Sequence, residues 1–253
     1  MFTQAVLQRR SVRSYSDLKF SDALKARIAE AVKALVPLYD DALTNFKFCP
    51  ANLIRNEIKG KIVKAPYYII ISAKKADGYL ENVGYMAEQL VIWLTENGIG
   101  SCYCGMGRPA GGSDISDEYC ITLALGFPSE TEPFRTEESQ FKRKELGDYL
   151  LGNKENDFLE PFLRCARLAP SAINGQPVFF EAAGNTIHVY RKKSVLAKME
   201  QMQRIDTGIA LSHIFMYAAE HGYHIDYYKD GNPAYNKYIY FISLNVMEET
   251  QDE

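Results

Sequence analysis

Several features of secreted, membrane and nucleic-acid-binding proteins are missing from this sequence of 253 residues. No uninterrupted apolar run approaches the roughly 20 residues that cross a bilayer. The first residues contain no apolar stretch before a small-residue cleavage site, so they do not form a secretory signal. The 29 basic and 32 acidic side chains leave a net charge of −3, without the cationic excess that binds phosphate backbones non-specifically. We therefore expect a cytoplasmic protein that binds neither membranes nor nucleic acids.

The cysteines and the common ligand-binding motifs are also informative. The five cysteines are odd in number, which is not typical of a disulfide framework and suits a reducing cytoplasm. The sequence has no Walker A loop, no GxGxxG after a strand and no spacing typical of zinc ligands. Cys102 and Cys104 are expected to point to opposite faces of a strand, which would make them a poor metal pair. We predict no metal site.

Hydrophobic periodicity predicts a chain that mixes helices and strands. A helix capped by Ser21 is expected to run as far as Pro37, and the region 40–63 gives no clear pattern. A buried strand is predicted at 67–73, followed by a helix at 82–97 that ends at Gly98. Further strands are predicted at 100–104, 121–127, 178–183, 186–191, 223–229 and 237–244, and helices at 143–151, 158–168 and 206–221 with Asp206 as N-cap.

The two long apolar helices resemble each other. When residues 82–104 are aligned without a gap to 206–228, four identities appear: Gly84 with Gly208, Glu96 with Glu220, Gly98 with Gly222 and Tyr103 with Tyr227. The order of the surrounding elements also recurs. The alternative is a pair of unrelated apolar helices that both end at a glycine.

The repeat predicts a fused, pseudo-symmetric dimer of two halves, with the long apolar helices at the interface between them. The halves would span residues 1–150 and 151–253, or the whole chain would form one continuous domain.

A basic cluster, RRSVR, occupies residues 9–13. It places three guanidinium groups and a hydroxyl within five residues at the end of a short predicted helix. Planar bidentate donors of this kind suit a dianionic phosphate. The alternative is a solvated run of charges.

A constrained polar loop, APSAINGQP, occupies residues 169–177. Its amide and hydroxyl side chains, framed by two prolines, are well suited to present hydrogen-bonding groups to a ligand in a fixed geometry. The alternative is a turn that only joins a helix to a hairpin. The candidate ligand-binding residues of this loop are Pro170, Ser171, Asn174 and Gln176.

A glycine-flanked turn follows the strand predicted at 100–104, in the sequence GSCYCGMG. Glycines let a backbone approach a planar ligand closely. The basic cluster, the GIGSC strand and the APSxxNxQP loop together resemble the flavin-dependent nitroreductase superfamily. The resemblance covers nearly the whole chain and is closest to the branch with two subunit-like halves fused in one chain, the putative TM nitroreductases. It implies an α+β fold of two pseudo-symmetric halves, each with a mostly antiparallel sheet flanked by helices.

The resemblance implies a binding site for FMN. In that family the basic motif holds the flavin phosphate, which implies Arg9, Arg10, Ser11 and Arg13 here. The turn after the GIGSC strand supplies backbone N–H groups to flavin N5 and O4. The corresponding residues are Cys104, Gly105 and Met106.

Further contacts are implied on both sides of the flavin. Lys142 and Arg143 resemble a basic pair that also reaches the phosphate, and Lys61 is placed near the pyrimidine side of the ring. The proline-framed loop packs on the isoalloxazine and comes from the partner subunit in true dimers. Pro170, Ser171 and Asn174 match it, and Gln176 belongs to the same loop.

The chain departs from a symmetric pair of sites. The basic cluster occurs once and the proline-framed loop once, in opposite halves. We therefore predict one FMN per chain, in a monomer that resembles a fused homodimer. Val178 stands where the family usually has an aromatic residue, which bears on ring packing and substrate choice.

The resemblance also implies an activity. NADH or NADPH would transfer a hydride to flavin N5, and an electron-poor acceptor such as a nitroaromatic compound, a quinone or a free flavin would then take it in a ping-pong cycle. The first half-reaction needs no acid or base from a side chain, and we assign no catalytic residue. Two alternatives stay open: a module that stores or hands over FMN without turnover, and a protein-interaction domain whose basic cluster is solvated.

Overall fold

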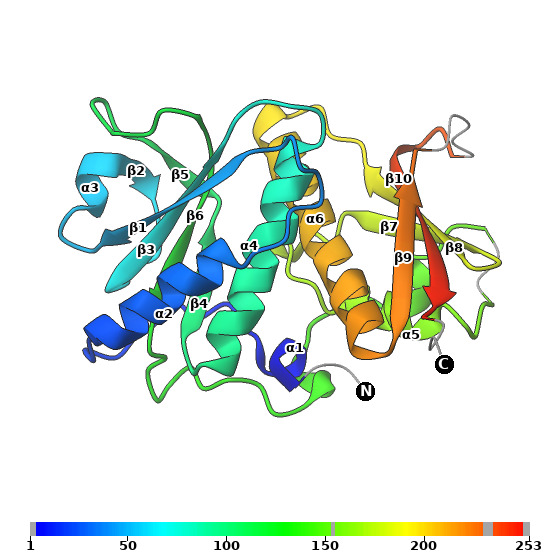
Figure 1. The fold of residues 1–253 in the computed structure, drawn as a ribbon, viewed down its shortest axis with the longest axis horizontal. Helices are drawn as coiled ribbons and strands as arrows, with labels where there is room; N and C mark the ends of the chain where they lie inside the picture. The colour runs from blue at the N-terminus through cyan, green and yellow to red at the C-terminus, as the bar shows by residue number, and fades with distance from the viewer. Residues whose placement is uncertain (1–3, 153–154, 230–234, 250–253) are drawn as a thin grey trace. The chain divides into compact units, whose positions relative to one another are not determined.

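The structure is a computed structural model that describes residues 4–152, 155–229 and 235–249. The described chain divides into two compact units, an N-terminal unit of Gln4–Gln140 and a C-terminal unit that begins at Phe141. The sequence analysis placed the corresponding boundary between residues 150 and 151. The predicted α+β class is confirmed, because each unit combines helices with a four-stranded antiparallel sheet (Figure 1).

The helices and strands of the N-terminal unit are α1 (Gln4–Gln8), α2 (Asp22–Lys33), β1 (Thr44–Pro50), α3 (Ile54–Glu57), β2 (Ile58–Lys61), β3 (Tyr67–Ala73), α4 (Tyr79–Glu96), β4 (Gly100–Cys104), β5 (Met106–Pro109) and β6 (Glu118–Gly126). Those of the C-terminal unit are α5 (Glu160–Arg167), β7 (Val178–Ala183), β8 (Thr186–Lys192), α6 (Ala197–Glu220), β9 (Tyr223–Tyr228) and β10 (Tyr238–Glu248).

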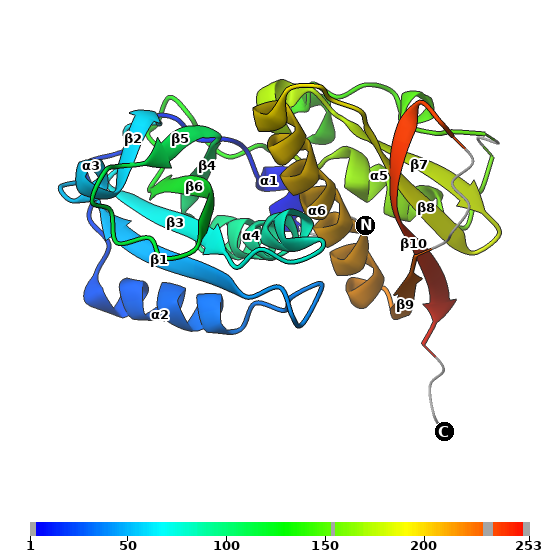
Figure 2. The same ribbon diagram turned by 90° about the horizontal axis from the view of Figure 1, so that it is seen from above.

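The sheet of the N-terminal unit has the strand order β1-β3-β6-β4. Every residue of β3 is buried, because α4 packs on the sheet and the segment around α3 and β2 covers other side chains of β3. Figure 2 shows α4 beside these strands. A strand covered on both faces reads as a continuous apolar run rather than an alternating one, which explains the sequence pattern at 67–73.

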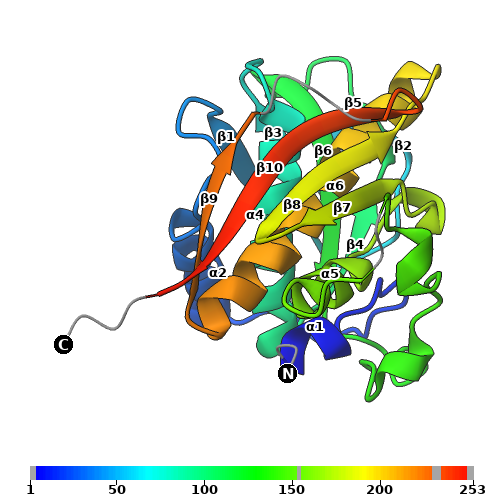
Figure 3. The ribbon, with the colours of Figure 1, turned by 90° about the vertical axis from the view of Figure 1, so that its right-hand side faces the viewer.

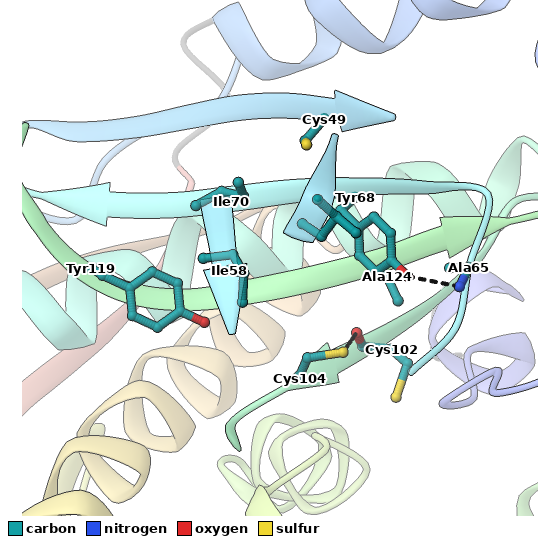
Figure 4. Packing of buried hydrophobic residues seen from close by; sticks show 10 residues of the cluster. Cys49, Ile58, Ala65, Tyr68, Ile70, Cys102, Cys104, Tyr119 and Ala124 are labelled. Atoms are coloured by element: carbon teal, nitrogen blue, oxygen red, sulfur yellow. Dashed lines mark hydrogen bonds between the residues drawn. The ribbon is translucent and has the colours of Figure 1, made fainter. Parts of the chain in front are cut away.

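One core cluster of this unit includes three of the five cysteines (Figure 4). Tyr68 lies in it, and its hydroxyl accepts a hydrogen bond from the Ala65 N–H at 2.9 Å. Cys102 and Cys104 both belong to this cluster, so the expectation that they point to opposite faces is wrong. Residues two apart in a strand share a face, because side chains alternate. Burial raises the pKa of Cys104 to about 12.

The sheet of the C-terminal unit has the strand order β7-β8-β10-β9. Figure 3 shows these strands side by side, and α6 contacts β7, β8, β9 and α5. Ala183 pairs with Thr186 across Gly184 and Asn185, which confirms the predicted two-residue hairpin turn.

The two units have the same topology. In each four-stranded sheet, two strands precede the long helix and two follow it, and the fourth of these strands lies between the second and the third. Gly98 and Gly222 follow the two helices, and both adopt φ of 72°. That left-handed conformation favours glycine, so these residues stop the helices as the sequence predicted. The placement of α4 and α6 at an interface stays a prediction.

Several element boundaries differ from the predictions. The helix expected from residue 82 begins at Tyr79, and the helix expected from residue 206 begins at Ala197. Asp206 therefore lies inside α6, and its assignment as an N-cap is wrong. The helix expected at 143–151 is reduced to a single 3-10 turn at Leu146–Asp148. Strands β1, β2 and β5 were not predicted.

Within the part of the chain that the structure describes, every helix is too short or too polar to cross a membrane.

Candidate functional site

The basic cluster lies along strand β4. Ser11 and Ser101 form a parallel bridge, and the Val12 N–H donates to the Ser101 carbonyl at 2.9 Å. Val12 is fully buried against Gly100, where an added Cβ would come within 2.8 Å of a Val12 methyl group. Glycine at position 100 thus permits the close approach. The predicted phosphate-binding segment is therefore paired with β4, the strand that leads into the predicted flavin-binding turn.

The cluster's first arginine is buried. Arg9 is only 2% exposed, and its Nε lies 3.8 Å from Glu88 Oε1. Burial lowers the pKa of Arg9, while the Glu88 carboxylate opposes this shift. The other carboxylate oxygen of Glu88 accepts a hydrogen bond from the Tyr103 hydroxyl at 2.9 Å. Arg9 therefore balances a buried charge inside the unit.

The remaining residues of the cluster are more accessible. Ser11 and Arg10 are half-buried and Arg13 is exposed. The Glu132 carboxylate accepts hydrogen bonds from the backbone N–H groups of Arg13 and of Ser14, the latter at 2.8 Å. This acidic anchor holds the backbone and leaves the Arg13 side chain at the surface. Glu132 could not be predicted as an anchor, because a single glutamate in a charged connector forms no sequence pattern.

Lys61 lies beside the turn that follows β4. Strands β2 and β5 pair so that Lys61 is directly opposite Met106. At Gly60, φ is +97° and an added Cβ would lie 2.5 Å from the Met106 carbonyl oxygen. Lys61 and Met106 are both exposed, and the Val63 N–H donates to Cys104 Sγ at 3.4 Å. The structure thus brings Lys61 together with Cys104, Gly105 and Met106.

The proline-framed loop of the C-terminal unit has a constrained backbone. Ile173, Asn174 and Gln176 adopt φ between 50° and 54°, a left-handed conformation that is uncommon for residues other than glycine. Backbone N–H groups of the loop are hydrogen-bonded within the loop itself. The Asn174 N–H donates to the Ser171 carbonyl at 3.0 Å, and the Gln176 N–H donates to Ser171 Oγ at 2.9 Å. Outliers that cluster in one loop are typical of ligand-binding segments.

The predicted basic pair contacts this loop directly. Arg143 Nη1 donates to Asn174 Oδ1 at 2.8 Å, and Asn174 Nδ2 donates to the Lys142 carbonyl at 2.9 Å. Gln176 Oε1 accepts a hydrogen bond from the Lys144 N–H at 2.9 Å and another from the Tyr149 hydroxyl. Lys142, Arg143, Asn174 and Gln176 therefore form one connected group in the C-terminal unit.

A buried carboxyl group lies beneath the loop. Asp206 is 5% exposed, and its two carboxylate oxygens lie 3.0 and 3.1 Å from the Ala172 N–H. Burial raises the pKa of Asp206 from 3.8 to about 8, and the Ala172 N–H opposes this shift. Asp206 also lines a cavity together with Pro170, Ser171 and Gln176. This role of Asp206 was not predicted, because the sequence pattern indicated a position at the start of a helix and not inside α6.

The predicted site residues thus form two groups, one in each unit. The N-terminal group contains Arg9, Arg10, Ser11, Arg13, Lys61, Cys104, Gly105 and Met106. The C-terminal group contains Lys142, Arg143, Pro170, Ser171, Asn174 and Gln176. Among the residues that the structure describes, no cluster of histidine, cysteine, aspartate or glutamate is suited to hold a metal ion.

Comparison with protein families identifies the chain. A family model described as "Putative TM nitroreductase" matches residues 2–218. The chain belongs to this family. Membership places it among the oxidoreductases in general and confirms the resemblance seen in the sequence. Comparison with curated proteins gives no match.

The chain is also similar to solved structures, one of which matches its fold over nearly the whole length. A crystal structure of a putative nitroreductase from Thermotoga maritima is 22% identical, covers 96% of this chain and 92% of its own, and gives a TM-score of 0.66. A nitroreductase family protein from Clostridium difficile is 15% identical over 62% of this chain and 99% of its own, with a TM-score of 0.49. A putative nitroreductase in complex with FMN from Desulfovibrio desulfuricans is 16% identical over 60% of this chain and 96% of its own, with a TM-score of 0.46.

Proposed function

We propose that the chain is an FMN-dependent NAD(P)H oxidoreductase of the nitroreductase type. One observation carries the proposal beyond family membership: the basic cluster is bridged to β4, the strand that leads into the Cys104–Met106 turn. Phosphate-binding side chains and backbone donors for a flavin ring therefore lie along the same strand.

The residues of the N-terminal group fit flavin mononucleotide chemically. A dianionic phosphate is best held by guanidinium and hydroxyl donors, which Arg13, Arg10 and Ser11 present at or near the surface. The exposed ammonium of Lys61, opposite Met106, is placed to offset negative charge on the pyrimidine side of a ring at the turn. The proposal includes Arg9 as a further phosphate ligand, in addition to its ion pair with Glu88.

The C-terminal group would cover the ring. Pro170 supplies an apolar surface, and Asn174 presents an amide whose orientation Arg143 and Lys142 fix. Both atoms of this amide retain capacity for a further hydrogen bond, one lone pair on Oδ1 and one hydrogen on Nδ2. The proposal requires the two groups to meet on one flavin.

In this proposal the FMN and the protein have different roles. Bound FMN would supply hydride transfer, from NADH or NADPH and then to an electron-poor acceptor such as a nitroaromatic compound, a quinone or a free flavin. The protein would bind the phosphate, orient the ring and stabilise negative charge with backbone N–H groups and cations. No acid or base side chain is assigned a catalytic role.

The stoichiometry belongs to the same proposal. The basic cluster and the proline-framed loop each occur once, so we propose one FMN per chain. The shared topology of the two units supports an internal duplication and a monomer that resembles a fused homodimer. Cytoplasmic location stays a prediction.

Two measurements on the purified full chain test this function. FMN is first titrated and the bound fraction followed by flavin fluorescence, with Arg13→Gln compared to the surface control Arg164→Gln, which loses only an exposed pair with Glu160. The loaded protein is then mixed anaerobically with NADH or NADPH while the flavin absorbance near about 450 nm is followed. Bleaching by either nucleotide supports the proposal. Tight binding without bleaching favours the storage module, and absence of binding overturns both.

A further inference from the structure

The carboxyl group of Asp206 is unusual among the acidic side chains of the C-terminal unit, because it is buried and bonded to a loop. Both of its oxygens contact one backbone N–H, that of Ala172, at 3.0 and 3.1 Å. No ion pair of Asp206 is present in the described chain, residues 4–152, 155–229 and 235–249. An isolated buried carboxylate is costly, so the neutral acid is favoured there.

A small cavity beside Asp206 leaves space for the O–H group of the neutral acid. Its volume is about 20 Å³, which is room for about one water molecule. Two other titratable groups border it, Arg167 from α5 and Tyr149 beyond the 3-10 turn, and the loop and β7 contribute none. Arg167 Nε donates to the Lys144 carbonyl at 2.6 Å, and the Tyr149 hydroxyl donates to Gln176. A neutral Asp206 can accept from Ala172 through one oxygen and donate its O–H into the cavity.

The contact with Ala172 lies at the start of the strained part of the loop. Ile173 and Asn174 follow directly, with φ of 50° and 54°. Left-handed conformations of such residues persist only where surrounding contacts hold them. The Asn174 side chain in turn meets Arg143. Release of Ala172 would therefore loosen the segment that orients Asn174.

We propose that Asp206 is a positioning residue for the proline-framed loop. As a neutral carboxylic acid it holds the loop closed, that is, with the Ala172 N–H bonded to Asp206. Ionisation of Asp206 favours the open loop, in which this contact is released. Its consequence for flavin binding rests on the proposed function, whereas the closure of the loop does not.

The direction of the pH dependence follows from the two states of the loop. In the closed loop burial holds the pKa of Asp206 at about 8, and in an open, hydrated loop it returns toward 3.8. Opening therefore releases one proton to solvent between these values. By linkage the opening constant rises about tenfold for each pH unit in this window and levels off above it.

Hydrogen exchange on the full chain between pH 5 and pH 8 measures this slope. The reporters are the Ala172, Asn174 and Gly175 amides, corrected for intrinsic exchange rates, with the Phe180 amide of β7 as the internal reference. We expect the opening constant of the reporters to rise about tenfold per pH unit, and to lose that slope in Asp206→Asn, which keeps an accepting oxygen but cannot ionise.

The controls separate the proposal from general effects and from the proposed function. Asp226→Asn removes an exposed carboxylate from β9 and should keep the wild-type slope. A flat wild-type profile, a slope that persists in Asp206→Asn, or a slope that Asp226→Asn also abolishes would overturn the proposal. Added FMN should protect the loop amides; absence of that protection counts against the proposed flavin site and leaves the slope as the test of Asp206.

Discussion

The guanidinium group of Arg143 donates a hydrogen bond to the side-chain oxygen of Asn174 at 2.8 Å. Helix α5 separates these residues in the chain. Arg143 also donates to the Leu168 carbonyl at 3.1 Å, so it connects the end of the helix to the loop that follows. The predicted basic pair is therefore part of the loop's support, in addition to its proposed contact with phosphate.

Replacement of Arg143 should weaken flavin binding more than it weakens folding. Arg143→Gln removes a charge-assisted hydrogen bond to Asn174, a type worth about 1.5–3 kcal/mol. Because Asn174 is exposed, most of this restraint acts on the loop rather than on global stability. We expect FMN affinity to fall about tenfold or more, as measured by fluorescence titration. Arg164→Gln should change neither quantity, and an unaltered affinity in Arg143→Gln would contradict this account.

Much of the fold could be predicted because its signals are local. Ser21 caps α2, since its hydroxyl accepts from the Leu24 N–H at 3.2 Å, and the glycine stops after α4 and α6 occur as expected. These features depend on a few adjacent residues. The start of α4 was missed because its N-cap is Gly78, at φ of 72°, without a side-chain hydrogen bond.

The remaining errors arise where tertiary contacts decide. Strand β1 contains Lys47 and ends at Pro50, a composition that weakens the strand pattern, and its pairing with β3 supplies the missing stabilisation. The first turns of α6, from Ala197 onward, contain more polar than apolar residues, and no capping side chain marks where the helix begins. The same holds for two residues that support the site: Glu132 and Asp206 act through hydrogen bonds from backbone N–H groups that are distant in the sequence. Sequence motifs could locate the candidate loops but not these anchors.

The buried ion pair should make Arg9 important for stability. Arg9→Met removes the guanidinium group whose Nε lies 3.8 Å from the buried Glu88 carboxylate, and breaking such a pair typically costs about 3–5 kcal/mol. Urea unfolding should show this loss in the free energy of unfolding. The double variant Arg9→Met with Glu88→Gln should recover most of it, because both charges of the pair are removed together. Unchanged stability in the single variant would show that the pair does not hold this segment.

The glycine at position 60 should be required for the pairing of Lys61 with Met106. In Gly60→Ala, alanine would have to adopt a φ of +97°, which is unfavourable for residues other than glycine. Its Cβ would also lie 2.5 Å from the Met106 carbonyl oxygen. Gly98→Ala is a matched control, since its φ is +72° and no heavy atom lies within 4 Å of the added Cβ. We expect Gly98→Ala to cost about 1 kcal/mol in unfolding free energy and Gly60→Ala clearly more. Equal losses would mean that the strands separate easily at this point.

The thiols should be unreactive in the folded protein. All five cysteines are buried, and burial raises the pKa of Cys104 and of Cys165 to about 12. Since the thiolate is the nucleophile, a raised pKa keeps the reactive fraction small below that value. A chromogenic disulfide reagent at about pH 8 should therefore label the native protein slowly and all five thiols rapidly in denaturant. Rapid labelling of a native thiol would contradict the burial seen here.

The central claim is that the two groups of residues bind one flavin together. A crystal structure of the FMN-loaded protein tests this most directly. The account predicts one flavin per chain, with its phosphate at Ser11 and Arg13, its N5 edge at the Cys104–Met106 turn and its ring in contact with Pro170 and Asn174. A flavin that contacts only one of the two groups, or one that binds elsewhere on the chain, would contradict it.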